Sequence, residues 1–266
     1  MIIDNDKNDV ENLFNSNYNK FLLFDVDGTL TLPREKIENS MIDSIKLLQK
    51  KGYKVGVVGG GTIAHIKDQL ENLTYELDYV FSENGTNSFK KNLEMFHNIN
   101  IKQIIGEKLL KEIINFSLKY MANISLPFKR GTFFELRSGI INICPMGRNC
   151  TYNERLQFIE YDHKHNILSN FRNELEKKFI STNNNIVFSI GSSVSIDMFL
   201  EQHRKPYCLK FLDEYIGNII FFGDKTNKGG NDYEISIDSR IKKSFTVLNP
   251  KHLESILKSI DNYFKS

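Results

Sequence analysis

The chain has 266 residues, of which 40% are hydrophobic and 26% charged, and its formal net charge at pH 7 is +2. This length can bury a large core in one or two domains, and the composition is that of a globular protein. The small net charge argues against nucleic acid as a partner, and no apolar run is long enough to cross a membrane, so we expect neither partner.

The N-terminal residues 1–19 are polar and rich in Asn and Asp, and we expect a loose leader or one short helix there. They lack the basic-then-apolar pattern of a signal peptide. The cysteines Cys144, Cys150 and Cys208 are odd in number and do not cluster as metal ligands do. Reduced thiols and a cytoplasmic location are therefore expected.

The first strong structural signal is the run from Phe21 to Phe24, four bulky apolar residues that predict a strand buried on both faces. Asp25 and Asp27 follow at its carboxyl end, and Gly28 allows a sharp turn. Ligands of open α/β sheets bind at that edge. Two neighbouring carboxylates there suit a divalent cation and a phosphate, with an oxygen of one as nucleophile and the other carboxyl moving a proton.

The alternative for this segment is an Asp-rich turn that caps a helix at Thr29 or Thr31. A bare D-x-D-G would make a capping turn and a catalytic carboxylate pair about equally good interpretations. The longer motif D-V-D-G-T-L-T after a buried strand favours the catalytic pair. At this point the sequence resembles the haloacid dehalogenase superfamily of phosphoryl-transfer enzymes.

The following segments alternate between helix and strand. The periodicity predicts helices over 38–51 and 63–73 and short strands over 53–58 and 79–81. This alternation predicts an α/β fold with a doubly wound, mainly parallel sheet.

A glycine loop closes the second strand. Gly59, Gly60, Gly61 and Thr62 precede the next helix, where backbone N–H groups suit a phosphate. An ordinary strand-to-helix turn is as good an interpretation on the glycines alone.

The pattern changes near residue 97. A long helix over 99–123 leads to strands over 132–137 and 140–143, with Ser138-Gly139 as a hairpin turn. Helices over 153–161 and 166–179 and strands over 186–190 and 194–199 follow. We therefore predict an inserted α+β cap domain over 97–200, between core segments 1–96 and 201–266.

The core pattern resumes with a helix over 206–212 and a buried strand over 219–222. Asp224 follows that strand, and a last strand (245–248) and a helix from Pro250 complete the core. Asp224 can complete a magnesium site with Asp25 and the Asp27 carbonyl. Both acidic motifs follow hydrophobic strands, and the two together indicate such a site far more strongly than either motif alone.

The whole chain after about residue 20 is similar to the eukaryotic phosphomannomutases. The segments that carry this resemblance include Thr31–Ile37, Gly56–Gly60, Arg130–Phe133, Pro145–Cys150, Asn153–Arg155, Phe188–Gly191, Ser195–Asp197 and Phe221–Asp232. The family's pattern departs from this chain at Gly61-Thr62, Ser192 and Arg204.

The resemblance implies roles for individual residues. Arg137, Arg148 and Arg155 match arginines that bind the distal phosphate, to which guanidinium groups are suited. Arg34, Ser195 and Asp197 match other substrate-binding positions. Lys205 matches the lysine that pairs with the nucleophile and the phosphate, and Ser236 with Asp238 matches a possible second cation site.

The implied activity is the magnesium-dependent interconversion of mannose 6-phosphate and mannose 1-phosphate, which feeds GDP-mannose synthesis. In that activity Asp25 would be the nucleophile, and Asp27 would move the proton. An aspartyl-phosphate, a hexose 1,6-bisphosphate activator and a homodimer through the caps are also implied. A sugar-phosphate phosphatase of the same superfamily shares every acidic residue, and a non-catalytic sugar-phosphate-binding protein is a third alternative. The residues do not separate mannose from glucose phosphates.

Overall fold

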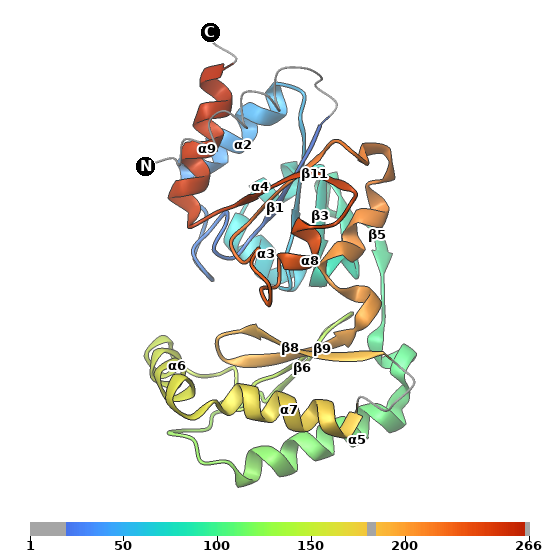
Figure 1. Ribbon diagram of the computed structural model, residues 1–266, viewed down its shortest axis with the longest axis vertical. Coiled ribbons are helices and arrows are strands. Elements are labelled where there is room, and N and C mark those ends of the chain that lie inside the picture. The colour runs from blue at the N-terminus through green and yellow to red at the C-terminus, as the bar shows by residue number, and fades with distance from the viewer. Residues whose placement is uncertain (1–19, 180–184, 264–266) are drawn as a thin grey trace. The chain divides into compact units, whose positions relative to one another are not determined.

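The computed structural model describes residues 20–179 and 185–263, so the expectation for residues 1–19 lies outside the described residues. The chain forms two compact units (Figure 1). The core unit comprises Met1–His97 and Lys205–Ser266, and the cap unit comprises Asn98–Arg204. The cap unit is therefore an insertion in the sequence of the core unit.

The core unit contains a seven-stranded sheet with the order β11-β10-β1-β2-β3-β4-β5. Neighbouring strands from β11 to β3 are parallel, and β4 runs antiparallel to β3. The strands are β1 (Phe21–Asp25), β2 (Lys54–Val58), β3 (Tyr79–Ser82), β4 (Asn87–Lys90), β5 (Glu94–Asn98), β10 (Ile219–Gly223) and β11 (Ile241–Thr246).

Both faces of this sheet are covered, which is why β1 is a continuous apolar run. Leu22 and Phe24 belong to one hydrophobic cluster with residues of helices on their face. Phe21 and Leu23 belong to a second cluster on the other face. The first cluster includes residues of α2 (Asn39–Lys50), α3 (Ile63–Leu70), α4 (Leu73–Glu76) and α9 (Pro250–Tyr263), and the second includes residues of η4 (Lys205–Phe211) and α8 (Tyr233–Ser236). The predicted doubly wound α/β core is confirmed.

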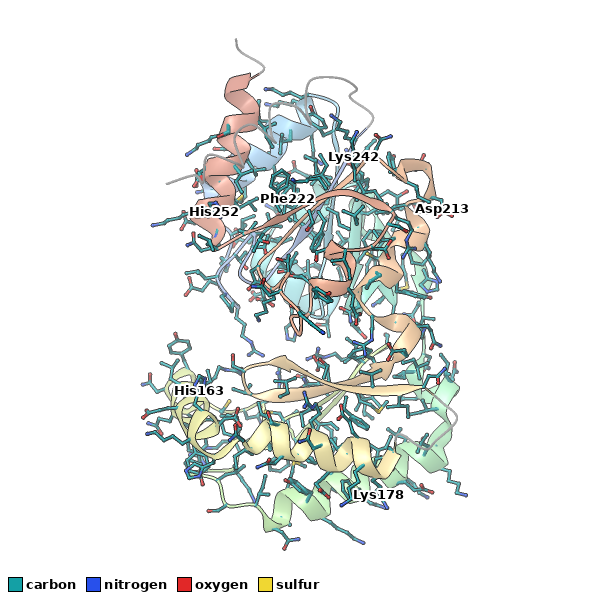
Figure 2. The ribbon with its side chains drawn as sticks, viewed as in Figure 1. His163, Lys178, Asp213, Phe222, Lys242 and His252 are labelled. Carbon is teal, nitrogen blue, oxygen red and sulfur yellow. The ribbon has the colours of Figure 1, made fainter. Side chains whose placement is uncertain are left out.

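Burial differs between a central strand and the edge strand of this sheet, as Phe222 and Lys242, both labelled in Figure 2, illustrate. Phe222 of β10 lies in the interior and is completely buried, stacked with Phe24 and Phe245. Lys242 of β11 is exposed, because β11 is the terminal strand and the pairing with β10 skips Lys242 at a register shift.

The sequence-based expectations were wrong for several elements of the core unit. Strands β4 and β5 were not expected, because Asn87–Lys90 and Glu94–Asn98 lack the apolar runs of the central strands. The last strand is Ile241–Thr246 and not 245–248, since an edge strand tolerates the polar residues of its first half. The segment expected as a helix over 206–212 is the 3₁₀ helix η4.

The cap unit contains a four-stranded antiparallel sheet with the order β6-β7-β9-β8. Its strands are β6 (Phe134–Leu136), β7 (Ile141–Ile143), β9 (Ser195–Leu200) and β8 (Ile186–Ser192). The N–H of Arg137 donates to the carbonyl of Ile140 at 3.0 Å, which confirms the hairpin turn at Ser138-Gly139.

One face of the cap sheet is apolar and packs against helices. Ile143, Ile196 and Phe188 lie on this face and join a buried cluster with residues of α5 and α7. The helices of this unit are α5 (Ile101–Asn123), α6 (Tyr152–His165) and α7 (Ile167–Phe179), and α5 lies beside α7 under the sheet (Figure 1). Helix α5 was expected to be continuous, but the backbone of Gly106 inside it is not helical (φ 79°).

The other face of the cap sheet is polar, because successive side chains of a strand point to opposite sides. The strand register places Glu135 opposite Asn142, Asn142 opposite Asp197, and Asp197 opposite Ser189. These residues form one polar row across all the strands of the sheet. The row lies on the face of the sheet opposite the hydrophobic core of the unit.

The turn after β7 depends on Gly147. Its φ is +89°, and a Cβ atom there would lie 2.6 Å from the carbonyl oxygens of both Arg130 and Gly131. The N–H of Arg148 donates to the carbonyl of Thr132 at 2.9 Å, so the same turn sets the position of Arg148.

We predict that Gly147→Ala destabilises the cap unit by more than the roughly 1–2 kcal/mol expected for a left-handed residue, since a backbone overlap adds to that strain. Denaturant unfolding measures the loss. The matched control is Gly106→Ala, which also has positive φ (+79°) but no atom within 4 Å of the added Cβ. An equal loss in both variants would refute the steric role of Gly147.

Candidate active site

Three carboxylates gather at the carboxyl ends of two adjacent strands of the core unit. Asp25 is the last residue of β1, Asp224 follows β10 directly, and Asp232 begins the turn into α8. One oxygen from each lies within 4.8 Å of the others. Asp25 and Asp232 are buried, and Asp224 is half-buried. The two sequence motifs therefore meet in space because β1 and β10 are parallel neighbours.

Lys205 lies among these carboxylates. Its Nζ donates to Asp25 Oδ1 at 2.5 Å and also to Asp232 Oδ1, and only 2% of its side chain is exposed. Burial alone would lower the pKa of Lys205, but the two carboxylates raise it above its ordinary value. Lys205 is therefore held as a cation. The neighbouring residue Arg204 pairs with Glu201, and the second carboxylate beside Lys205 comes from Asp232.

Burial has the opposite consequence for the nucleophile candidate. It raises the pKa of Asp25 to about 7, and the neighbouring Asp232 and Asp224 add to the effect while Lys205 opposes it. Asp25 Oδ2 is buried and has no hydrogen-bond partner within the described part of the chain. This oxygen is therefore placed for a ligand that carries positive charge or for bond formation.

Two glycines make the close approach of the carboxylates possible. A Cβ atom on Gly28 would overlap Asp224 Oδ2, and one on Gly223 would lie 2.6 Å from Asp232 Oδ2. The glycines of D-V-D-G and G-D-K-T are thus needed for packing as much as for turning.

The three carboxylates fit a hard divalent cation. They offer only oxygen donors, as Mg²⁺ prefers, and one of those oxygens is buried without a partner. When ionised, the three carboxylates and the Lys205 ammonium together carry two negative charges, which one divalent cation would neutralise. Across residues 20–179 and 185–263, this is the only such grouping of His, Cys, Asp and Glu.

The second cation site expected at Ser236 and Asp238 stays a prediction, and both side chains have protein partners in this structure. Asp238 accepts hydrogen bonds from Arg240 Nε at 2.9 Å and Nη2 at 2.8 Å, and this pairing lowers the pKa of Asp238. The hydroxyl of Ser236 donates to the carbonyl of Tyr233. The carboxylate is thus already neutralised by a protein cation.

The Asp27 carboxylate is exposed and lies outside the carboxylate cluster. Its Oδ1 accepts from Gln69 Nε2 at 2.8 Å and from the backbone N–H of Arg34 at 3.0 Å. Arg34 itself has positive φ (65°), so this turn is held in an uncommon conformation. These contacts orient Asp27 from α3 and from the turn that follows its own motif.

The glycine loop connects β2 to α3. The N–H of Gly59 donates to the carbonyl of Phe81, and the carbonyls of Gly59 and Gly61 accept from Asn84 and Glu83. Thr62 caps α3, since its hydroxyl accepts from the N–H of His65 at 3.3 Å. Although Gly61-Thr62 differs from the family's usual residues, the N-terminus of α3 is still capped by Thr62.

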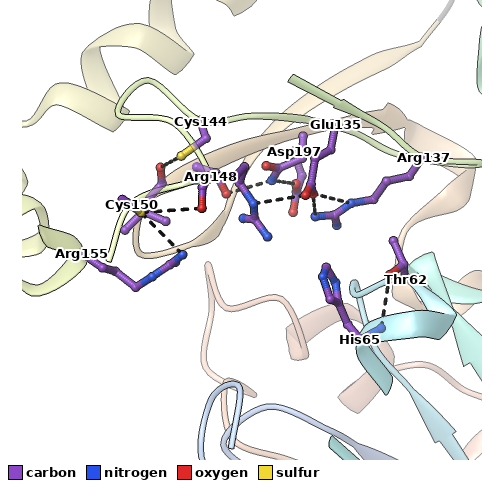
Figure 3. Close-up of polar contacts among 12 residues, drawn as sticks. Thr62, His65, Glu135, Arg137, Cys144, Arg148, Cys150, Arg155 and Asp197 are labelled. Carbon is purple, nitrogen blue, oxygen red and sulfur yellow. Dashed lines mark hydrogen bonds and ion pairs between the residues drawn. The ribbon is translucent and has the colours of Figure 1, made fainter. Parts of the chain in front are cut away.

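In the cap unit, Glu135 lies between two of the expected phosphate-binding arginines (Figure 3). Its Oε2 accepts from Arg137 Nη2 at 2.6 Å, and its Oε1 lies 3.5 Å from Arg148 Nε. The exposed fractions of the Arg137 and Arg148 side chains are 7% and 9%. Two nearly buried guanidiniums are thus brought together on the polar face of the sheet.

Asn142 connects the expected sugar-binding pair. Its Nδ2 donates to Ser195 Oγ at 2.8 Å and to Asp197 Oδ1 at 2.6 Å. Burial raises the pKa of Asp197, and Arg137 opposes this shift most strongly. Ser195 and Asp197 are therefore oriented by a third polar side chain of the same sheet face.

Arg155 lies on α6, near the turn that carries Arg148. Its Nη2 lies 3.9 Å from the Sγ of Cys150, whose thiol faces the carbonyl of Arg148 (Figure 3). Thr151 and Glu154 form a capping box at the start of this helix, and Glu154 also pairs with Arg130. The fixed helix start determines where Arg155 projects.

Three polar residues of these clusters were not predicted as site residues. Asp232 stands in the G-G-N-D segment, but its pairing with Lys205 depends on tertiary structure. Glu135 and Asn142 alternate with apolar residues in short strands, and this period-2 pattern was the available signal.

The core unit and the inserted cap unit together have a haloacid dehalogenase-like fold. A haloacid dehalogenase-like hydrolase from Bacteroides thetaiotaomicron has a similar fold, with a TM-score of 0.57 and 13% identity over 92% of this chain and 99% of that chain. The IMP-nucleotidase of Plasmodium falciparum has a TM-score of 0.64 and 18% identity over 94% of this chain and 64% of that chain. The described helices include none long and apolar enough to cross a membrane.

The sequence comparisons identify the family within this class. The model of the eukaryotic phosphomannomutases matches residues 41–263. A phosphomannomutase of Dendrobium officinale is 46% identical over 86% of this chain and 89% of its own length, and phosphomannomutase 1 of Dictyostelium discoideum is 46% identical over 91% and 96%. The chain belongs to the eukaryotic phosphomannomutase family, and its resemblance to these isomerase-class enzymes is confirmed.

The buried position of Lys205 leads to a stability prediction. Lys205→Met should cost about 3–5 kcal/mol of unfolding free energy, because it leaves buried carboxylates without their cation. The added change Asp232→Asn should recover much of that loss. Denaturant unfolding measures each variant, and Lys210→Met is the control because Lys210 is exposed on the same element. A Lys205→Met protein as stable as this control would contradict the structural role of the ammonium.

Proposed function

We propose that this chain is a phosphomannomutase that interconverts mannose 6-phosphate and mannose 1-phosphate. The observation that carries the proposal is the 46% identity to phosphomannomutases over both the core and cap segments. The activity would supply mannose 1-phosphate for GDP-mannose synthesis. A cytoplasmic location is part of the same proposal and is supported by three cysteines without disulfide bonds. A homodimer formed through the cap unit is also part of it and is supported by family membership.

Asp25 is the proposed nucleophile. Lys205 holds its Oδ1, while Oδ2 has no hydrogen-bond partner among the described residues. In the proposed reaction, a carboxylate oxygen of Asp25 attacks the phosphorus of a hexose 1,6-bisphosphate, and the sugar oxygen leaves. An aspartyl-phosphate and a hexose monophosphate result.

Asp27 is the proposed general acid and base. It gives a proton to the departing sugar oxygen and then takes one from the hydroxyl that attacks the aspartyl-phosphate. Gln69 and the Arg34 backbone fix its orientation, so the proton is delivered from a defined side. The Arg34 side chain is the proposed substrate contact of this turn.

Asp25, the Asp27 carbonyl and Asp224 would hold the Mg²⁺ ion, with Asp232 beside them. Bound magnesium would neutralise charge on the transferring phosphoryl group. A cation at these carboxylates also favours their ionised form and would lower the raised pKa of Asp25 toward the value that a nucleophile needs. The glycine loop from Gly59 to Thr62 is the proposed backbone contact for the same phosphate.

The cap unit is proposed to recognise the other phosphate and the sugar. Arg137, Arg148 and Arg155 provide guanidinium groups for a phosphate. Ser195 and Asp197, aligned by Asn142, provide hydrogen bonds for sugar hydroxyls. A bisphosphate intermediate must present each of its phosphates to Asp25 in turn, so the arginines must accept either end of the sugar.

The route of the phosphoryl group tests this function. With a hexose 1,6-bisphosphate labelled in its phosphoryl groups and saturating mannose 1-phosphate, we expect label in hexose 6-phosphate and much slower release of labelled inorganic phosphate. A mutase must protect its aspartyl-phosphate from water, although water is far more abundant than sugar. Asp25→Asn is the control and should transfer no label. Label released mainly as inorganic phosphate would identify a phosphatase.

The role of the cap arginines leads to a second prediction. Arg148→Ala should reduce kcat/KM for mannose 1-phosphate by about tenfold or more, since a charge-assisted contact contributes on the order of 1.5–3 kcal/mol. Hydrolysis of a small aryl phosphate, which has no distal phosphate, should change far less. Steady-state kinetics on both substrates makes the comparison. Equal losses on the two would indicate a folding defect and contradict the distal-phosphate role.

A further inference from the structure

We propose that Glu135 is an internal counter-ion that competes with the substrate's phosphate for Arg137 and Arg148. It would keep the affinity of the cap unit for phosphate low enough to allow release in every catalytic cycle. Glu135 is then a positioning residue that acts through the arginines and not on the reacting atoms. This inference rests on the proposed function and deepens it.

The contacts place Glu135 where a phosphate would otherwise bind its arginines. Each of its two carboxylate oxygens serves a different guanidinium, Oε2 that of Arg137 and Oε1 that of Arg148. A phosphate would use the same kind of charge-assisted contact with the same N–H groups. The Glu135 side chain is 28% exposed, so solvent reaches it more than it reaches Arg137 or Arg148.

The charges of the cluster support a tuning role. Arg137, Arg148 and Arg155 with the carboxyl groups of Glu135 and Asp197 carry a net charge of +1 when all five are ionised. Without Glu135 the same groups would carry +2, the charge of a phosphate monoester dianion with its sign reversed. A phosphate bound beside the Glu135 carboxylate is also repelled by it, because like charges at short range destabilise one another.

Moderate affinity follows from the needs of a mutase. The arginines must release one phosphate of the bisphosphate and bind the other before the reaction can finish. A contact that is equally strong in the ground state and the transition state lowers KM without raising kcat. Excess phosphate affinity would therefore slow the reorientation, while a built-in anion can take over the guanidiniums when the phosphate leaves.

The test is the affinity for inorganic phosphate, measured by calorimetric titration of the full-length protein with Mg²⁺ present. We expect Glu135→Gln to bind phosphate at least on the order of fivefold more tightly than the wild type, since the repulsion of one nearby negative charge is worth about that factor even when water screens it fully. Glu135→Asp keeps the charge and should stay close to the wild type. In an Arg148→Ala background, Glu135→Gln should change phosphate affinity far less.

The matched control is Glu154→Gln. Glu154 also pairs with an arginine of the cap unit, Arg130, which is not among the expected phosphate ligands. Gln still supports a capping box at this position. Glu154→Gln should therefore leave phosphate affinity unchanged, which separates a local effect of Glu135 from a general change of charge.

Kinetics provides the second measurement. Glu135→Gln should lower both KM and kcat for mannose 1-phosphate, whereas a merely structural glutamate would raise KM on removal. Unchanged or weaker phosphate binding by a folded Glu135→Gln protein would overturn the proposal. The labelled-bisphosphate experiment on the wild type tests the mutase function separately, so a phosphatase result there and a failed Glu135 titration remain distinguishable.

Discussion

The core unit depends on one buried interaction, the Lys205 ammonium between the carboxylates of Asp25 and Asp232. It joins the end of β1, the first residue after the cap unit and the loop after β10, three segments that lie far apart in the sequence. Burying three charged groups is costly unless each has a partner, so the chain must bring all of them together or none. The fold of the core and the chemistry of the nucleophile are therefore consequences of the same contact.

In the cap unit, the alternation of side chains along the strands places the polar site residues. Because side chains of β6, β7 and β9 alternate, one face of the sheet is filled by residues such as Ile143 and Ile196 and the other presents Glu135, Asn142 and Asp197. The apolar face fixes the strand register, since a slip by one residue would exchange the two faces. Hydrophobic packing against α5 and α7 thus determines which polar side chains meet on the opposite side.

The parts of this structure that the sequence predicted are those with strong local signals. The apolar run Phe21–Phe24 and the acidic motif after it predicted a buried strand that ends in Asp25, and both are present. Strand β4 could not be recognised, because it is short and contains Asn87 and Ser88. The pairings of Asp232 and Glu135 depend on which strands become neighbours and on side-chain conformations, and no sequence spacing determines these.

The two clusters handle charge in opposite ways. In the core unit, carboxylates outnumber the Lys205 ammonium, and burial raises the pKa of Asp25 until a cation compensates. In the cap unit, Arg137, Arg148 and Arg155 outnumber the carboxyl groups of Glu135 and Asp197, which leaves a positive surplus suited to phosphate. In each cluster, groups of the less numerous sign pair with the others and reduce their repulsion. Both are thus ordered before a ligand binds, and the remaining charge of each sets which ligand it attracts.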